Sequence, residues 1–317
     1  MKILVTGGCG YVGSVLVPLL VSSGHQVVVV DTAWFGNYLS ESSSLEVIEK
    51  SYDKINLGDL NDIEAVIHLA NIANDPSVEL NPVFSWETNV LHTTQLLEMC
   101  KRISTVKKFI YASSGSVYGV KTEPEVTEEL SLVPISAYNK TKMSAERVCL
   151  SYIDNFDVYC VRPATVCGIS PRMRFDVVVN MFVLQAYKNR KITVFGGDQI
   201  RPNIHIDDMA AVYKHFINES GLTSGCYNAG FENISVLSIA NKVATLFDVN
   251  LEIKESNDPR SYRQDSSKLL ATGFNPAKSV DDAITEISAA LKSKRLLDED
   301  RWHTVKWMTT MKIGQQI

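Results

Sequence analysis

The chain has 317 residues, of which 45% are hydrophobic and 21% are charged, and its formal net charge at pH 7 is −5. This composition is typical of an ordinary globular protein, and the acidic balance provides no general field that would attract nucleic acid or an anionic membrane. We therefore expect neither nucleic acid nor a membrane as a partner. The sequence also lacks an apolar stretch long enough to span a bilayer or to act as an N-terminal signal, which favours a cytoplasmic protein.

The first thirty residues predict one βαβ unit. An apolar run at 2–6 ends in glycines, helix-type apolar spacing follows at 11–22, and a second run rich in valine covers 26–31. Strands of this kind, joined by a helix, are parallel and buried on both faces, and their crossover is right-handed.

The same alternation continues to about residue 165. Apolar runs predict strands at 65–70, 108–113 and 158–162, and periodic segments predict helices at 83–102 and 137–155. Strands that alternate with helices predict an α/β fold, namely a Rossmann-type doubly wound parallel sheet. We assign residues 1–165 to a nucleotide-binding Rossmann domain.

After residue 166 the pattern loosens, and we expect a smaller C-terminal substrate-binding lobe over 166–317, with some segments returning to the first domain. Its predicted elements are helices at 177–189, 234–247 and 280–294, a short strand at 192–195, a loop-rich segment at 203–208 and a polar, Pro-containing segment at 254–276. The segment 302–317 shows no clear periodicity.

Six cysteines are scattered through the chain without a CxxC pair. This spacing matches neither a zinc site nor a disulfide framework. We expect reduced cysteines that pack as small core residues, and no bound metal.

Glycines at positions 7, 10 and 13 lie between the first predicted strand and the first predicted helix, in the segment TGGCGYVG. A turn that passes close to a pyrophosphate leaves no room for a Cβ atom, and the helix N-terminus then faces the phosphates. Asp31 ends the second strand, where a carboxylate accepts hydrogen bonds from a ribose 2′-hydroxyl and repels a 2′-phosphate. No basic residue follows directly, so the pattern predicts NAD rather than NADP.

Tyr138 and Lys142 form a Tyr-x-x-x-Lys pair on one face of a predicted helix. A phenol with a pKa of ~10 is a poor base at neutral pH, but a nearby ammonium and a positive nicotinamide ring favour the phenolate. Upstream, the strand that ends in YASSGSVYG places hydroxyls at the carboxyl edge of the sheet, where such sheets bind ligands. Together these residues predict proton transfer coupled to hydride transfer at an alcohol carbon.

The glycine turn, the serine-rich strand end and the Tyr-x-x-x-Lys helix, in this order, resemble the extended branch of the short-chain dehydrogenase/reductase superfamily, which contains nucleotide-sugar epimerases and dehydratases. The resemblance covers nearly the whole chain. It implies that Ser114 is the catalytic hydroxyl, that Tyr138 is the acid/base, and that Lys142 binds the cofactor ribose and lowers the tyrosine pKa. Ser116 is implied as a further sugar contact.

The resemblance also implies a set of cofactor contacts. Asp59-Leu60 is similar to an adenine-contacting pair, His68-Leu69-Ala70 is similar to the HLAA strand of the branch, and Asn89 matches a recurrent helix asparagine. The implied cofactor-binding residues are Gly7, Gly10, Tyr11, Val12, Gly13, Asp31, Asp59, Leu60, Leu69, Ala70, Asn89, Tyr138 and Lys142.

The second half resembles the branch more loosely. Arg201 begins the segment RPNIHIDD, which is similar to a segment whose arginine contacts the nucleotide diphosphate, and Arg260 lies in a loop that resembles a phosphate-proximal one. Thr165 stands where an asparagine often holds the diphosphate, and Arg172 offers another phosphate contact. The implied substrate-binding residues are Ser116, Thr165, Arg172, Arg201 and Arg260.

Related 4,6-dehydratases carry Thr-Asp-Glu before Val-Tyr-Gly, because loss of water needs carboxyl groups, whereas this chain has Ser114-Gly115-Ser116. We therefore expect an NAD-dependent epimerase that acts on a nucleotide-diphosphate sugar, at C4, through a transient keto intermediate. An NAD(H)-dependent nucleotide-keto-sugar reductase or dehydrogenase is one alternative, and a non-catalytic NAD-sensing protein is another. The resemblance further implies a homodimer.

Overall fold

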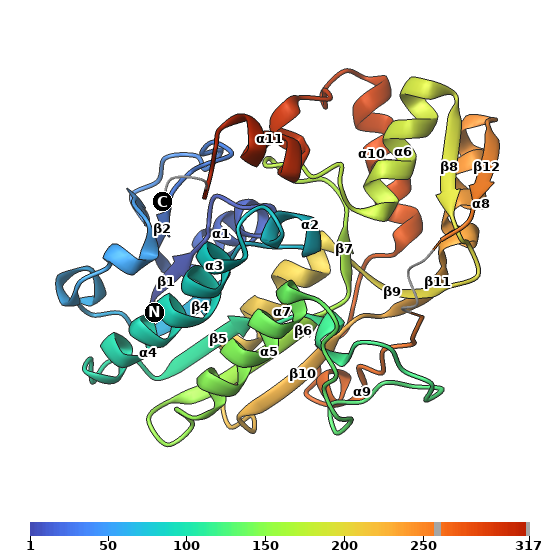
Figure 1. The fold of residues 1–317 in the computed structure, drawn as a ribbon. Helices are drawn as coiled ribbons and strands as arrows, with labels where there is room; N and C mark the ends of the chain where they lie inside the picture. The colour runs from blue at the N-terminus through green and yellow to red at the C-terminus, as the bar shows by residue number, and fades with distance from the viewer. Residues whose placement is uncertain (257–260, 315–317) are drawn as a thin grey trace.

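The computed structural model describes residues 1–256 and 261–314 and shows a large parallel sheet with helices on both faces (Figure 1). In this part of the chain the sheet has seven strands in the order β10-β6-β5-β4-β1-β2-β3, and all neighbours are parallel. The Rossmann-type fold is confirmed. The strands are β1 (Lys2–Thr6), β2 (Gln26–Asp31), β3 (Leu45–Glu49), β4 (Ala65–His68), β5 (Lys108–Ala112), β6 (Asp157–Pro163) and β10 (Gly225–Ala229).

The sheet is buried on both sides, as its apolar strands require. The valines at 27–30 in β2 are at most 4% exposed. Helices α1 (Gly13–Ser22) and α7 (Ile206–Asn218) pack on one face, and α4 (Thr93–Lys101) and α5 (Ala137–Leu150) pack on the other. Between β1 and β4 the strand order reverses, so the loops that follow these strands diverge and open a crevice at the carboxyl edge of the sheet.

The second half builds its own core beside this crevice. Helices α6 (Val178–Asn189), α8 (Val236–Phe247) and α10 (Val280–Lys292) contribute Phe182, Ile239 and Ile287 to it. Two small sheets, in the orders β11-β9-β7 and β12-β8, complete the lobe. Their strands are β7 (Thr165–Cys167), β8 (Lys191–Phe195), β9 (Ile200–His205), β11 (Glu232–Ser235) and β12 (Asn250–Lys254).

The segment 203–208, predicted to be loop-rich, is instead the end of β9 and the start of α7. Its polar residues have structural partners: the His205 side chain accepts the backbone N–H of Asp207 and caps α7, and Asp208 accepts the N–H groups of Ala277 and Lys278. The prediction was wrong because polar residues in capping and bridging positions concealed a buried strand and helix. Strand β10 and helix α7 return to the large sheet from the second half of the sequence.

The helix predicted at 83–102 is divided. It consists of α3 (Pro82–Trp86), a π-helical segment (Glu87–His92) and α4. The hydroxyls of Thr93 and Thr94 bond back to the carbonyls of Asn89 and Val90, and the carbonyl of Thr88 accepts the Tyr52 hydroxyl. Side-chain bonds of this kind compete with the regular helical ladder and explain the wider turn.

Three short helices lie between the larger elements: α2 (Asp75–Val78), α9 (Ser267–Leu270) and α11 (Thr304–Thr310). Helix α11 lies beside the crevice, where the Trp307 indole donates to the carbonyl of Trp34 (2.6 Å) and Met308 packs with Ile72 and Val78. The hydrogen bond between Trp307 and Trp34 joins the segment around residue 307 to the loop that follows β2.

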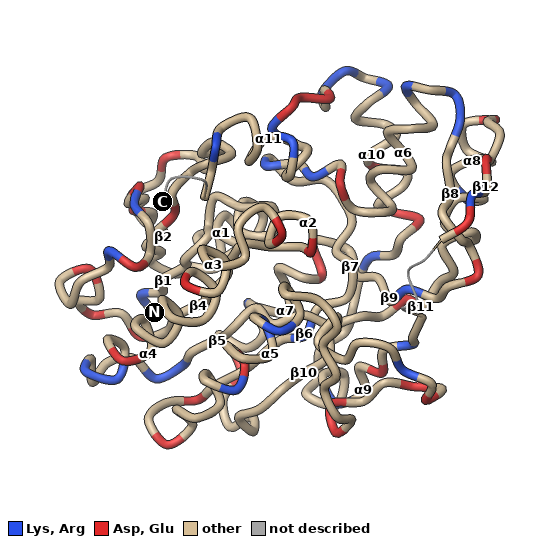
Figure 2. The backbone as a smooth tube through the Cα atoms, in the orientation of Figure 1, with Lys and Arg blue, Asp and Glu red and all other residues tan. Residues whose placement is uncertain are grey.

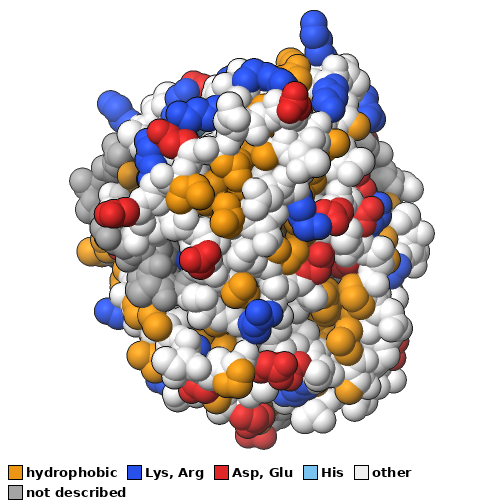
Figure 3. Space-filling view, turned by 90° about the vertical axis from the view of Figure 1, so that its right-hand side faces the viewer, with side chains coloured by type: hydrophobic (Ala, Val, Ile, Leu, Met, Phe, Trp, Pro, Cys, Tyr) orange, Lys and Arg blue, Asp and Glu red, His pale blue; other side chains and the backbone are white. Residues whose placement is uncertain are grey.

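The surface is mixed in character. Acidic and basic residues are interspersed along the outer helices and loops (Figure 2). On the face that carries β8, β12 and α8, apolar side chains form small groups between polar ones (Figure 3).

No helix among the described residues has the length and apolarity to cross a membrane. All six cysteines lie in the described part of the chain and are free, and five of them are buried.

Candidate active site

A cavity of about 840 Å³ lies at the point where the strand order reverses, between the large sheet and the second half of the chain. This volume is in the range of cofactor and small-molecule sites. Its lining includes most of the predicted site residues: Gly7, Gly10, Tyr11, Val12, Gly13, Asp31, Leu69, Ala70, Ser114, Ser116, Tyr138, Lys142, Thr165, Arg172 and Arg201.

The glycine turn after β1 is shaped by close backbone packing. Gly7 has φ +75°, and a Cβ atom there would lie 2.6 Å from the backbone nitrogen of Ala70. A Cβ atom on Gly13 would lie 2.5 Å from the carbonyl oxygen of Gly7. Within the described residues, α1 has no side-chain cap, and the Ser14 N–H already donates to the carbonyl of Gly10 (2.9 Å). The backbone N–H groups of Tyr11, Val12 and Gly13 have no partner among these residues, so they are available to an anion at the cavity wall.

Asp31 is fixed at the end of β2 by the turn itself. Its carboxylate accepts the backbone N–H of Cys9 (2.9 Å) and of Ala33 (2.8 Å). Burial raises the pKa of Asp31, and these two hydrogen bonds oppose that rise. The carboxylate retains acceptor capacity at the cavity wall, which suits a pair of ribose hydroxyls.

Tyr138 and Lys142 lie on the same face of α5, one turn apart. Burial raises the pKa of the Tyr138 phenol, whereas the Ser114 hydroxyl, the charge of Arg174 and the backbone N–H of Asn74 lower it. The Lys142 Nζ atom donates to the carbonyl of Ala112 (2.7 Å) and lies 5.9 Å from the centre of the Tyr138 ring. Burial lowers the pKa of Lys142 to about 7, so this amine titrates near neutrality.

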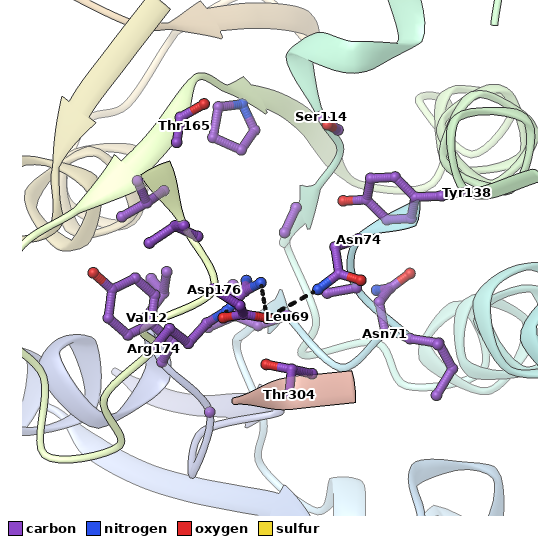
Figure 4. A pocket seen from close by; sticks show the side chains of 18 of the residues that line it. Val12, Leu69, Asn71, Asn74, Ser114, Tyr138, Thr165, Arg174, Asp176 and Thr304 are labelled. Atoms are coloured by element: carbon purple, nitrogen blue, oxygen red, sulfur yellow. Dashed lines mark hydrogen bonds and ion pairs between the residues drawn. The ribbon is translucent and has the colours of Figure 1, made fainter. Parts of the chain in front are cut away.

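The serine-rich end of β5 faces Tyr138 across the cavity (Figure 4). The Oγ atoms of Ser114 and Ser116 lie 2.7 Å apart, and the backbone N–H of Ser116 donates to Ser114 Oγ (3.2 Å). The short helical turn at Gly115–Tyr118 holds both hydroxyls at the cavity wall. A hydroxyl, a phenol and an ammonium therefore converge, as proton transfer to and from an alcohol requires.

The second half contributes an ion pair that the sequence did not identify as part of the site. The Arg174 guanidinium binds both oxygens of Asp176 (2.9 and 3.1 Å), and the Asn74 side-chain amide donates to the same carboxylate (3.3 Å), as Figure 4 shows. Burial opposes ionisation of Asp176, but Arg174 and Thr304 outweigh it and hold the pKa of Asp176 at about 2. Asn74 has φ +76°, a conformation that costs a non-glycine residue about 1–3 kcal/mol and tends to occur at functional sites.

Asn71 is a second residue whose role was not predicted. It lines the cavity, and both polar atoms of its amide are buried without a hydrogen-bond partner among the described residues. The available signal was a departure from the pattern, because an asparagine follows His68-Leu69-Ala70 where a small residue is usual. Buried amide atoms without partners are expected where a ligand completes the hydrogen bonding.

Three predicted cofactor residues do not line the cavity. The Asp59 carboxylate is paired with Lys50 (2.5 Å), which lines the cavity itself, and Leu60 is fully buried in the core. Asn89 is also buried, where its side chain bonds to the backbone of Ile72 and to the Thr141 hydroxyl. The structure thus places Asn89 behind the loop that follows β4. Arg260 lies outside the described residues.

The cavity can be compared with those of known proteins. A family model, the NAD dependent epimerase/dehydratase family, matches residues 3–230. UDP-glucuronic acid decarboxylase 1 of Danio rerio is 27% identical over 311 residues, which cover 90% of this chain and 71% of that protein. The uncharacterized UDP-glucose epimerase YtcB of Bacillus subtilis (strain 168) is 29% identical over 316 residues, which cover 92% of this chain and 98% of that protein. The solved UDP-glucuronic acid 4-epimerase of Bacillus cereus, in complex with UDP-glucuronic acid and NAD, has a TM-score of 0.81 and is 28% identical. The match covers 93% of this chain and 100% of that chain.

Proposed function

Because the chain belongs to the NAD-dependent epimerase/dehydratase family, which confirms NAD as the expected cofactor, we propose that it is an epimerase that inverts C4 of a UDP-sugar through a transient keto intermediate. The UDP-sugar class is supported by the solved epimerase crystallised with UDP-glucuronic acid and NAD. Epimerisation at C4 is supported by the side chains around Tyr138.

The observation that carries this proposal is the set of groups beside Tyr138. Ser114, Ser116 and Lys142 supply hydroxyls and an amine, and no carboxylate stands in the Ser114–Ser116 segment. Of the described lining residues, the carboxylates are Asp31, Asp75 and Asp176. Asp31 is fixed by the glycine turn, and Asp176 is paired with Arg174. Asp75 acts on Tyr138, because its charge raises the pKa of that phenol, but it is a single carboxylate and not a pair. This arrangement favours proton transfer at a hydroxyl over elimination of water, which needs a carboxyl acid/base pair.

The residues fit NAD. The glycine turn packs its backbone too closely against the loop after β4 to admit a Cβ at Gly7, and the Asp31 carboxylate suits the ribose hydroxyls. The backbone N–H groups at the start of α1 are available for the diphosphate. Bound NAD would accept the C4 hydride and return it to the opposite face of the sugar ring.

The side chains of this chain would then move the proton. Tyr138 takes it from the C4 hydroxyl and later returns it, and Ser114 donates a hydrogen bond that orients the reacting oxygen. The Lys142 amine favours the tyrosinate, because a positive charge near a phenol stabilises its ionised form. Inversion requires the keto-sugar to turn within the cavity before the hydride returns.

The experiment is a product analysis with catalytic amounts of NAD. Purified protein is mixed with UDP-glucose, UDP-galactose, UDP-glucuronic acid and their N-acetylhexosamine counterparts, and products are identified by mass spectrometry and NMR. We expect a product of unchanged mass with C4 inverted. A product that has lost carbon dioxide would identify the protein as a decarboxylase, and a product that has lost water would identify it as a dehydratase. A product that differs by two hydrogens, formed with stoichiometric consumption of NAD or NADH, would identify it as an oxidoreductase. NAD binding without turnover of any sugar would favour the non-catalytic alternative.

We also propose a homodimer formed through α3, the π-helical segment and α5. Val83 on α3 and Leu91 in the π-helical segment are 61% and 52% exposed, which leaves apolar area for a second copy. Sedimentation equilibrium tests the proposal, and a monomer at micromolar concentration would exclude it.

A further inference from the structure

Arg172 is a buried cation in the loop between β7 and α6. It is 3% exposed, it lines the cavity, and its guanidinium carbon lies 3.8 Å from the centre of the Phe35 ring. Phe35 lies in the loop that follows β2, just after Asp31 at the end of that strand. Arg172 therefore reaches from the second half of the chain to the part of the cavity bounded by the Rossmann sheet.

The hydrogen bonding of Arg172 is incomplete. Its Nη atoms make two long contacts, to the carbonyl of Met173 (3.5 Å) and to the hydroxyl of Thr304 (3.4 Å), and its buried Nε atom has no partner among the described residues. No carboxylate in the described part of the chain lies within ion-pair distance of it, and nearby Asp176 is already bound by Arg174. Burial and the like charge of Arg174 lower the pKa of Arg172 to about 9.

A buried guanidinium without a counter-ion is unfavourable, and the usual remedy is an anion that accepts its fork of N–H groups. The glycine turn TGGCGYVG contains no cation, and the nearby Lys50 is paired with Asp59. The wall of the cavity next to Asp31 and Phe35 therefore supplies backbone N–H groups for phosphate but no free side-chain cation of its own among these residues. Arg172 lies where that charge is needed.

We propose that Arg172 binds the diphosphate of the dinucleotide cofactor, and not the diphosphate of the substrate as the sequence suggests. The Phe35 ring, 3.8 Å from the guanidinium carbon, positions the guanidinium, while the long contact to Thr304 leaves its N–H groups able to bind an anion. Arg201, which comes from β9 in the small sheet of the second half, remains the candidate for the substrate diphosphate. The inference rests on NAD binding, and it holds whether or not the chain is an epimerase.

Calorimetric titration of the full-length, nucleotide-free protein separates these assignments. ADP-ribose carries the cofactor diphosphate, adenosine lacks it, and UDP carries the substrate diphosphate. We expect Arg172→Met to weaken ADP-ribose binding by about tenfold or more, which is the range for a charge-assisted hydrogen bond, while adenosine and UDP binding change by less than about twofold. Arg201→Met is the matched control, with UDP weakened and ADP-ribose unchanged.

Thermal unfolding supplies a second readout that does not depend on turnover. Because Arg172 is buried without a counter-ion, Arg172→Met should raise the Tm of the free protein and shrink the Tm increase that ADP-ribose produces. Arg162→Met, which removes a guanidinium paired with Glu146 (2.6 Å), should lower the Tm. Arg172→Lys, which keeps the charge, covers the case in which the methionine variant does not fold, and it should bind ADP-ribose more weakly than the wild type.

The outcomes distinguish this inference from the proposed function. If Arg172→Met weakens UDP binding and leaves ADP-ribose binding unchanged, Arg172 binds the substrate diphosphate and the inference is wrong. Equal weakening of adenosine and ADP-ribose, or no change with any ligand, would leave Arg172 a packing residue and overturn the inference. If Arg201→Met leaves UDP binding unchanged, the proposed UDP-sugar site fails while the assignment of Arg172 stands.

Discussion

The two walls of the cavity are built differently. The wall from the Rossmann sheet consists of strand ends, the glycine turn and α5, and it presents backbone N–H groups, hydroxyls and one buried lysine. The wall from the second half consists of loops and short strands, and it presents arginines, an aspartate and part of α11. Regular buried elements fix the groups of the first wall, whereas hydrogen bonds between side chains fix those of the second.

Under the proposed function, this difference separates the groups of the reaction from the groups that select the ligand. Groups that transfer a proton must hold their geometry, and α5 and β5 are held by the core of the sheet. Charged groups on loops can be exchanged without disturbing that core, which is how one fold serves many substrates. Relatives with decarboxylase and epimerase names are consistent with such exchange.

The largest effect should come from the first wall. Tyr138→Phe removes the hydroxyl that we propose exchanges the proton, so we expect turnover to fall by about 10²–10⁴-fold, with NAD affinity and Tm close to the wild type. Steady-state kinetics and NAD titration measure both. Activity within a few-fold of the wild type would remove Tyr138 from the mechanism and with it the contrast between the walls.

The glycine turn provides a sharper test of backbone shape. Gly7→Ala forces a Cβ to 2.6 Å from the backbone nitrogen of Ala70 at φ +75°, and it should cost about 3 kcal/mol of unfolding free energy and about tenfold or more in NAD affinity. Gly24→Ala is the control: φ is +85°, but no heavy atom of the described residues lies within 4 Å of the added Cβ. It should cost about 1 kcal/mol and leave NAD affinity unchanged. Equal effects of the two substitutions would show that the turn is not a close-packed cradle.

The second wall should be the acid-sensitive one. The folded-state pKa of Asp176, about 2, is below its ordinary value of 3.8, so its ion pair stabilises the fold above pH 3.8 and this contribution is lost as pH falls towards 2. Urea unfolding of wild type and Asp176→Asn should differ by about 2 kcal/mol at pH 6, and the difference should shrink at about pH 3. A difference that does not depend on pH would mean that the carboxylate charge is not what holds this wall.

The smallest effect on stability concerns the buried lysine of the first wall. The folded-state pKa of Lys142, about 7, is below its ordinary value of 10.5, because burial disfavours the charged amine. Burial of the charge therefore lowers the unfolding free energy fully below pH 7, and this penalty disappears only above pH 10.5. Lys142→Met should therefore raise unfolding free energy by about 1 kcal/mol at pH 7, because the burial penalty disappears although the Ala112 carbonyl loses its donor. The gain should vanish at high pH, and turnover should be lost. A variant less stable than the wild type at pH 7 would contradict this.

What could be predicted from the sequence follows the same division. Strands β1 and β2 were predicted at their observed bounds, because glycines end the first run and β-branched residues fill the second. The residues of the glycine turn, Ser114 and the Tyr-x-x-x-Lys pair also meet at one cavity, because the carboxyl ends of parallel strands share one edge.

The second wall could not be predicted in this way. Its residues meet through contacts between distant segments, such as Asn74 with Asp176 and Arg172 with Phe35, and no periodicity records such pairs. The sequence did not indicate the positive φ of Asn74 either, because asparagine is common in polar loops whatever their backbone conformation.

Helix α11 has a consequence for how the protein is made. Met308 and Gly7 line the same cavity although they lie near opposite ends of the sequence. During synthesis the seven-stranded sheet of the described residues can assemble once β10 has left the ribosome, whereas the segment that joins Trp34 through Trp307 emerges later. A growing chain can therefore form the sheet and its crevice before the hydrogen bond between Trp307 and Trp34 is made.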